Sequence, residues 1–219
     1  MLGRRFQPAM KLLTSELIPA EGDSHSLMIV LHGLGDSMDG WRWLPGELQL
    51  PWLSYLLVNA PDEYYGGFSW FDFAGDSRPG ILRSREKLTK LLELTADSGF
   101  PSEQTYLLGF SQGSLLTLDV GFRYPNRLAG LIGISGYVFE PENLLRELSP
   151  VARSQRALVT HGFEDPLIPF NEVRPQIEML LAAHLLISWR GFHKEHTIAG
   201  PAELSVIRKF VEAGLTNAT

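Results

Sequence analysis

The sequence predicts an α/β fold in which helices cover both faces of a doubly wound, mostly parallel sheet. Short apolar runs recur along the chain without polar alternation, and such runs are typical of strands buried on both faces. Longer segments with helical periodicity lie between them, which predicts right-handed crossovers between parallel strands. The chain has 219 residues, a length that suits one domain with a sizeable core. We therefore expect a single domain over residues 1–219.

The strands of this sheet are predicted from the apolar runs, taken in chain order. These runs are Leu27–Leu31, Tyr55–Val58, Tyr106–Phe110, Leu128–Ser135, Ala157–Thr160 and Leu185–Trp189. The segment Lys11–Ile18 alternates more strongly between apolar and polar residues, which favours an edge strand. In sheets of this kind the active site lies at the carboxyl ends of the strands, so functional side chains are sought directly after each run.

The helices are predicted from apolar residues at helical spacing. Leucines between Leu88 and Leu92 share one face of a helix that ends near Gly99, Glu172–Ala183 forms another, and a C-terminal helix starts at Pro201. Segment 136–156, between two predicted strands, is too short for a large lid domain. We therefore expect a site that is open apart from its loops.

Composition excludes several classes of function. The net charge of −6 argues against nucleic acid as a partner. The chain has no cysteine, which excludes disulfides, a thiol nucleophile and thiolate metal sites. No stretch has the length and apolar character of a transmembrane helix, and polar residues interrupt the N-terminal segment where a signal peptide would be apolar. We therefore expect a soluble, cytoplasmic protein without stable membrane insertion.

The pentapeptide Gly109–Gly113 carries the strongest chemical signal. It reads G-F-S-Q-G, with the apolar run Tyr106–Leu108 before it and the helical run Leu115–Leu118 after it. This is the strand, sharp turn and helix context of a G-x-S-x-G nucleophile elbow. The flanking glycines are needed because larger residues would clash in so tight a turn. The sequence thus predicts that Ser111 is a nucleophile held at the start of a helix.

A serine hydroxyl needs a histidine to take its proton and a carboxylate to orient that histidine. On this architecture the chain order is serine, acid, histidine. Asp165 follows the strand Ala157–Thr160 and is the predicted acid, whereas Glu164 is expected to point away. His196 directly precedes the C-terminal helix region and is the predicted base. His193 then belongs to the loop.

His193 and His196 also form an H-x-x-H pattern, which raises the alternative of a metal site. The sequence offers no third ligand nearby, so no metal is predicted.

The oxyanion formed by attack of the serine needs backbone N–H donors. Gln112 follows the nucleophile and supplies one amide at the helix start. The glycine-rich loop after the first buried run supplies Leu34 as the second donor, and His32 is expected to brace this loop. An alternative interpretation of the same loop is a dinucleotide-binding motif. Met38, however, stands where that motif requires its third small residue.

Together these segments resemble the phospholipase/carboxylesterase family of α/β-hydrolases, which includes the acyl-protein thioesterases. The resemblance covers about residues 25 to 213 and rests on Leu31–Ser37 with Gly40–Trp41, on Ser69–Asp72, on Leu108–Gly113, and on His161–Gly162 with Asp165, Pro166 and Pro169. Two positions depart from the family pattern. Ser114 stands where a further glycine is common, and Glu195 precedes His196 where a small residue or methionine is usual.

The resemblance implies a serine hydrolase of α/β-hydrolase fold that cleaves carboxylic esters through an acyl-enzyme, without a cofactor. Small-molecule acyl thioesters and lysophospholipids are further candidate substrates. Two alternatives stay open: an acyltransferase that uses the same triad, and a binding module of this fold without turnover.

Aromatic residues crowd the segment from Tyr64 to Phe73. A wall for an acyl chain would have this composition, and so would the packed core of a long loop. Phe68 and Trp70, together with Phe110 of the elbow, are the candidate substrate contacts.

Overall fold

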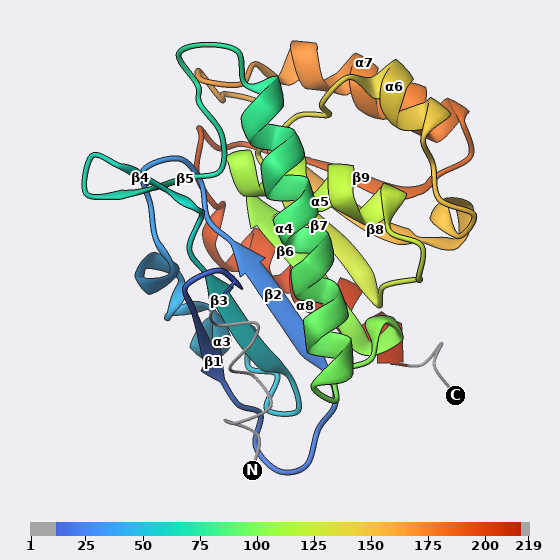
Figure 1. Cartoon of the computed structure of the whole chain (residues 1–219). Helices are drawn as coiled ribbons and strands as arrows, with labels where there is room; N and C mark the ends of the chain where they lie inside the picture. Colours follow the sequence, from blue (N-terminus) through green and yellow to red (C-terminus); the bar gives the residue numbers. More distant parts are fainter. Residues whose placement is uncertain (1–11, 216–219) are drawn as a thin grey trace.

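A seven-stranded sheet forms the centre of the protein (Figure 1). The computed structural model describes residues 12–215. The strand order is β1-β3-β2-β6-β7-β8-β9. All neighbouring strands are parallel except β1 and β3, which are antiparallel. The strands are β1 (Ser15–Ile18), β2 (Leu27–Leu31), β3 (Ser54–Val58), β6 (Thr105–Phe110), β7 (Gly130–Ile134), β8 (Arg156–Gly162) and β9 (Leu186–Phe192).

The buried strands β2, β3, β6, β7 and β8 confirm the predictions made from apolar runs. Every residue of β2, β3 and β7 is buried. β1 lies at one edge of the sheet, as the stronger alternation of its segment predicted, although Lys11 lies outside the described residues.

β9 differs from its prediction as a strand covered on both faces. It is the other edge of the sheet, and its side chains alternate between exposed and partly buried. Ile187 and Trp189 pack against the core, whereas Leu186 is 53% exposed. The apolar run therefore reflects packing on one face only.

Side chains that alternate along the strands pack into two hydrophobic cores, one on each face of the sheet. Residues such as Ile29, Leu107 and Val159 belong to the core that α4, α5, α6 and α7 cover. Their neighbours Met28, Leu108 and Leu158 belong to the core under α3 and α8. Figure 1 shows α4 and α5 crossing the front of the sheet and α8 behind it. This is the doubly wound arrangement that the sequence predicted.

The long helices lie close to their predicted limits, and several short elements are additional. The α-helices are α3 (Leu44–Leu48), α4 (Arg78–Asp97), α5 (Gln112–Arg123), α6 (Pro141–Arg146), α7 (Phe170–Ala182) and α8 (Gly200–Leu215). The 3₁₀ turns are η1 (Met38–Trp41), η2 (Ser102–Gln104) and η3 (Ala152–Ser154), and β4 (Asp62–Tyr64) pairs with β5 (Gly67–Ser69) in a separate hairpin. Between β7 and β8 only α6 and η3 intervene, so no large lid domain is present there.

The strand order reverses direction beside β2. β3 lies on one side of β2 and β6 on the other, and later strands continue away from β6. In open α/β sheets such a switch point leaves a crevice at the carboxyl ends of the two central strands. The loop after β2 and the turn after β6 meet there.

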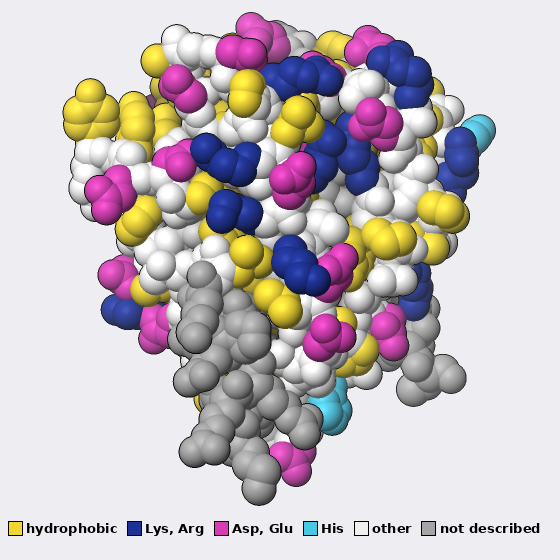
Figure 2. Space-filling view, viewed as in Figure 1, with side chains coloured by type: hydrophobic (Ala, Val, Ile, Leu, Met, Phe, Trp, Pro, Cys, Tyr) yellow, Lys and Arg dark blue, Asp and Glu magenta, His cyan; other side chains and the backbone are white. Residues whose placement is uncertain are grey.

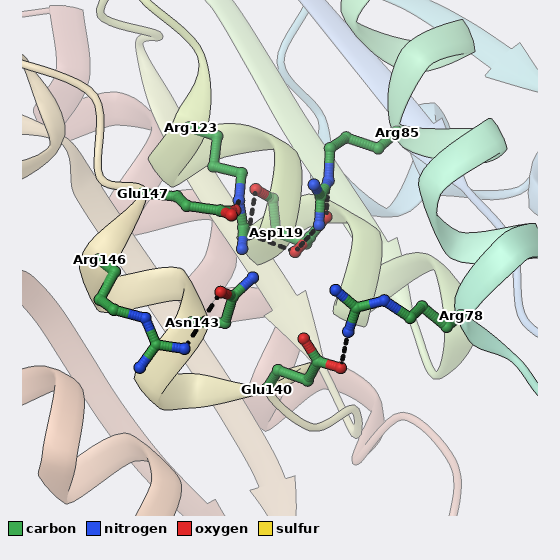
Figure 3. A network of polar contacts seen from close by, with 8 residues as sticks. All are labelled: Arg78, Arg85, Asp119, Arg123, Glu140, Asn143, Arg146 and Glu147. Atoms are coloured by element: carbon green, nitrogen blue, oxygen red, sulfur yellow. Dashed lines mark hydrogen bonds and ion pairs between the residues drawn. The ribbon is translucent and has the colours of Figure 1, made fainter.

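A buried carboxylate anchors α5, the helix that follows this turn. Asp119 is almost fully buried and pairs with Arg85 of α4 and with Arg123 one turn further along α5 (Figure 3). Arg123 also pairs with Glu147, 2.8 Å away, beyond the end of α6. Because a buried charge needs partners, this network links α5 to the elements on both of its sides.

Charges of both signs are interspersed on the face that α4 crosses (Figure 2). Several are paired at the surface, as are Arg83 with Asp62 and Lys90 with Glu93, and such exposed pairs contribute little stability. Within residues 12–215 no helix is both long and apolar enough to cross a membrane.

Candidate active site

Ser111 lies in a strained turn between β6 and α5. Its backbone has φ of 54° and ψ of −115°, a region that residues with a side chain rarely adopt. The turn is held because the Ser111 amide donates to the carbonyl of Ile134 at 2.9 Å. The hydroxyl is thereby presented at the carboxyl edge of the sheet, at the start of α5.

The glycines two residues before and after Ser111 are required by close backbone contacts. A Cβ at Gly109 would overlap the carbonyl of Gly113, and a Cβ at Gly113 would overlap the carbonyl of Leu31 in β2. Only hydrogen fits at either place. The expectation that larger residues would clash in this turn is confirmed.

His196 and Asp165 form a hydrogen-bonded chain with Ser111. Nε2 of His196 lies 3.0 Å from Oγ of Ser111, and Nδ1 lies 2.7 Å from Oδ2 of Asp165. These side chains come from the turn after β6, the loop after β8 and the loop after β9. The structure thus brings together the residues that the sequence selected as nucleophile, acid and base.

Asp165 is fixed by its own loop. Its Oδ1 accepts the amide N–H groups of Leu167 at 3.0 Å and Ile168 at 2.9 Å. Burial raises the pKa of Asp165, but the hydrogen bonds from Ile168, His196 and Leu167 outweigh it and hold the pKa below its usual value. The carboxylate is therefore ionised and aimed at the imidazole.

His161 supports this loop, a role that sequence reasoning did not assign. Its Nε2 donates to the carbonyl of Ile168 at 2.8 Å and lies 3.6 Å from Asp165 Oδ2. Burial lowers the pKa of His161, so the ring is neutral. In the sequence, the only indication of this role is that His161 and Gly162 lie in the segment that resembles the family around Asp165.

The competing residues, His193 and Glu164, lie at the surface away from Ser111. The His193 side chain is 86% exposed, and its Nδ1 lies 3.3 Å from Glu164 Oε1. The rival histidine and the rival carboxylate therefore face each other, and within residues 12–215 neither side chain forms a hydrogen bond or ion pair with Ser111, His196 or Asp165.

His32 holds the loop after β2 in place through hydrogen bonds, as expected from the sequence. This side chain is fully buried. Its Nδ1 donates to the carbonyl of Gly33 at 2.6 Å, and its Nε2 accepts the amide of Ala60 at 3.0 Å. Burial lowers the pKa of His32, which keeps it a neutral brace.

The amides of Leu34 and Gln112 are available to a ligand. Both residues line the same cavity as Ser111 and His196. Among residues 12–215 neither backbone N–H has a protein acceptor. This is what donors aimed at an oxyanion require.

Besides the backbone amide, the Gln112 side chain forms structural contacts that the sequence did not reveal. Its Oε1 accepts the Trp70 amide at 3.0 Å, and its Nε2 donates to the Phe71 carbonyl at 3.0 Å. The Ser69 hydroxyl contacts both Gln112 and the Phe71 carbonyl. The start of α5 is thus clamped to the aromatic segment after β5.

A cavity of about 480 Å³ opens beside Ser111. Its apolar wall includes Phe110, as the sequence suggested, but neither Phe68 nor Trp70 lines it. Trp70 is fully buried, and its indole N–H donates to the His32 carbonyl at 2.9 Å, which corresponds to the alternative of core packing. The aromatic side chains on the wall are Phe71, Phe73, Phe110 and Tyr137.

No group of three or more His, Cys, Asp or Glu side chains suited to a metal ion occurs within residues 12–215. The polar groups of the site instead form one linear chain from carboxylate to hydroxyl. Such a chain moves a proton between an imidazole and a serine.

The sequence profile of the Phospholipase/Carboxylesterase family matches residues 13–215. Acyl-protein thioesterase 1 of Schizosaccharomyces pombe is 32% identical over 170 residues, which cover 72% of this chain and 76% of that protein.

Two solved structures are also similar to this chain. The crystal structure of esterase PE8 has a TM-score of 0.82 at 28% identity and covers 92% of this chain and 98% of its own. The Bacillus cereus carboxylesterase has a TM-score of 0.81 at 18% identity, with 95% and 97% covered. At that identity the likeness concerns the fold alone.

Proposed function

The chain belongs to the phospholipase/carboxylesterase family of α/β-hydrolases and is a serine hydrolase of esters or thioesters, and we propose that Ser111, His196 and Asp165 carry out its chemistry. The observation that supports this assignment is the hydrogen-bonded chain from Asp165 through His196 to Ser111, at 2.7 and 3.0 Å. Each distance is within the reach of proton transfer in a nucleophile–base–acid arrangement.

The first half of the reaction forms an acyl-enzyme. Ser111 Oγ attacks the carbonyl carbon of the substrate while its proton passes to Nε2 of His196. The ionised Asp165 accepts the Nδ1–H hydrogen bond and stabilises the imidazolium. The tetrahedral intermediate then collapses, the bond to the alcohol or thiol breaks, and the leaving group takes the proton from His196.

The second half releases the acid. A water molecule gives its proton to His196 and attacks the acyl carbon, and collapse of the second tetrahedral intermediate returns the proton to Ser111 Oγ. In both halves the charge on the carbonyl oxygen develops toward the amides of Leu34 and Gln112. Donors of this kind contribute about 10²–10³-fold each to kcat.

The cavity supports small acyl groups as the substrate class. Its wall is mainly apolar, and α6 and η3 leave no large lid above it. We infer short to medium acyl esters or thioesters of small molecules, with Phe71, Phe73 and Tyr137 against the acyl chain. Thioester cleavage is also the activity named for the Schizosaccharomyces pombe relative.

The assignment is tested by a fluorophosphonate probe together with a panel of p-nitrophenyl esters and acyl thioesters of graded length. The wild-type protein should be labelled and should turn over the short and medium substrates. Ser111→Ala should abolish labelling and lower kcat by about 10⁴-fold or more, with unchanged thermal unfolding. Equal labelling of both proteins, or more than a tenth of the activity in the variant, would disprove the role of Ser111.

A further inference from the structure

His196 is carried by an irregular loop between β9 and α8. The loop runs from residue 193 to residue 199, and the side chains of His193, Glu195 and Thr197 are exposed. Neither helix nor strand hydrogen bonds therefore fix the position of the base. Nonetheless its Nε2 must remain about 3 Å from the serine for proton transfer.

Lys194 and Glu203 form a buried ion pair beneath this loop. The ammonium of Lys194 donates to both carboxylate oxygens of Glu203, at 2.6 and 2.8 Å. The exposed fractions of the two side chains are 2% and 0%. Glu203 lies in the first turn of α8, so the pair joins the loop to a helix that packs on the sheet.

The same carboxylate also holds the other end of the loop. Glu203 Oε2 accepts the amide N–H of Ala199 at 2.6 Å. One buried side chain thus fixes residue 194 on one side of His196 and residue 199 on the other. The Lys194 carbonyl in addition accepts the Glu164 amide at 3.2 Å, which joins this loop to the loop of Asp165.

Stability alone gives little reason for a pair of this kind. Removing two charges from water is unfavourable, and well-packed apolar residues of similar volume are often as stabilising or more so. Burial lowers the pKa of Lys194, and the charges of Glu203 and Asp165 counteract this effect. The ion pair fixes two positions of the loop through directional hydrogen bonds, which an apolar pair would not provide.

Resting on the function proposed above, we propose that Lys194 and Glu203 are positioning residues for the catalytic base. By holding both ends of segment 194–199, they keep the imidazole of His196 between Ser111 and Asp165. Neither residue touches the substrate cavity, so they act through His196 and not on the substrate.

The test uses Lys194→Met, Glu203→Leu and the double variant, each measured for kcat, KM and thermal unfolding at a temperature where all are folded. Lys90→Met is the control, because Lys90 forms an exposed pair with Glu93. Either single variant should lose stability, since it leaves one buried charge without its partner. In the double variant stability should recover, while kcat stays about tenfold to a hundredfold below wild type and KM changes less than twofold.

A purely structural pair predicts a different result. In that case kcat would recover with stability in the double variant, and this outcome would overturn the positioning role. Should the double variant fail to fold, Glu203→Gln replaces it, because the amide retains one acceptor oxygen. A folded Glu203→Gln protein with wild-type kcat would equally overturn the proposal, and a reduced kcat with unchanged KM would support it.

The rate of fluorophosphonate labelling distinguishes this proposal from the proposed function. A wild-type protein that is labelled and active, with variants labelled as fast as wild type, would contradict only the positioning role. A wild-type protein that is neither labelled nor active would contradict the function itself and the role of the pair with it.

Discussion

Replacing Asp165 by asparagine separates the charge of this side chain from its shape. Oδ1 of the amide can still accept the N–H groups of Leu167 and Ile168, which bind that oxygen at 3.0 and 2.9 Å. The amide NH₂ then faces Nδ1 of His196 in place of Oδ2. Because an amide N–H cannot accept from an imidazole N–H, the ring would carry its proton on Nε2.

An imidazole protonated on Nε2 cannot take the proton of Ser111. We therefore expect Asp165→Asn to lower kcat by about 10⁴-fold, which corresponds to about 5 kcal/mol of lost transition-state stabilisation. The variant should still fold, since the loop hydrogen bonds are kept. Steady-state kinetics on a short p-nitrophenyl ester, with thermal unfolding in parallel, measures both quantities.

Glu164→Gln is the matched control for this experiment. Glu164 is the adjacent carboxylate, is 61% exposed and pairs with the surface side chain of His193. This variant should keep nearly full activity. A kcat of Asp165→Asn within tenfold of wild type, or a comparable loss in Glu164→Gln, would refute the assignment of the acid.

Further predictions follow from the same geometry. His196→Ala should lose esterase activity as completely as Ser111→Ala, whereas His193→Ala should keep most of it; the reverse ranking in steady-state assays would move the base to His193. Asp119→Asn should lower the free energy of unfolding by about 3–5 kcal/mol, because two arginines lose a buried carboxylate, and a urea titration with no change would contradict this. The pKa of Asp165 is lower in the folded protein, so its contribution to stability is full above its unfolded pKa of about 3.9 and is lost as the pH falls through the lower folded value. The difference in unfolding free energy between wild type and Asp165→Asn should therefore shrink over this pH range. A difference that grows as the pH falls would contradict the prediction. Phe73→Ala should shift the preferred acyl length without destabilising the protein, since Phe73 is 71% exposed and lines the cavity; an unchanged length profile would remove it from the acyl wall.

Local patterns in the sequence determined the sheet and the turn that carries Ser111. Strands such as β2 and β7 are buried on both faces, so their sequences contain almost no polar residue, and this signal needs no knowledge of their neighbours. The elbow depends on glycines within two residues of Ser111. The glycine pattern is local in the sequence, whereas the atoms that exclude a side chain at Gly113 belong to Leu31 and His32, about eighty residues earlier.

The places of the acid and the base could also be predicted, because parallel strands bring their carboxyl ends to one edge of the sheet. Asp165 and His196 each follow a strand, so the topology alone places their loops near the turn of Ser111. The structure places their side chains within hydrogen-bond distance.

Only the tertiary structure decided the partners of the polar side chains. Gln112 reaches Trp70 and Phe71 across more than forty residues of chain, and nothing in either segment specifies the other. Trp70 and Phe73 are equivalent aromatic residues in the sequence, yet the first is buried in the core and the second lies at the rim of the cavity.

The same limit applies to the edge of the sheet and to the loop of the base. The apolar run of β9 predicted burial on both faces, but burial depends on whether another element covers the strand, and within residues 12–215 side chains of one face, such as Leu186, stay exposed. The pair of Lys194 and Glu203 would appear from sequence as two ordinary surface charges. It is buried because the loop after β9 folds back against α8, and such non-local packing has no periodicity that a sequence pattern could reveal.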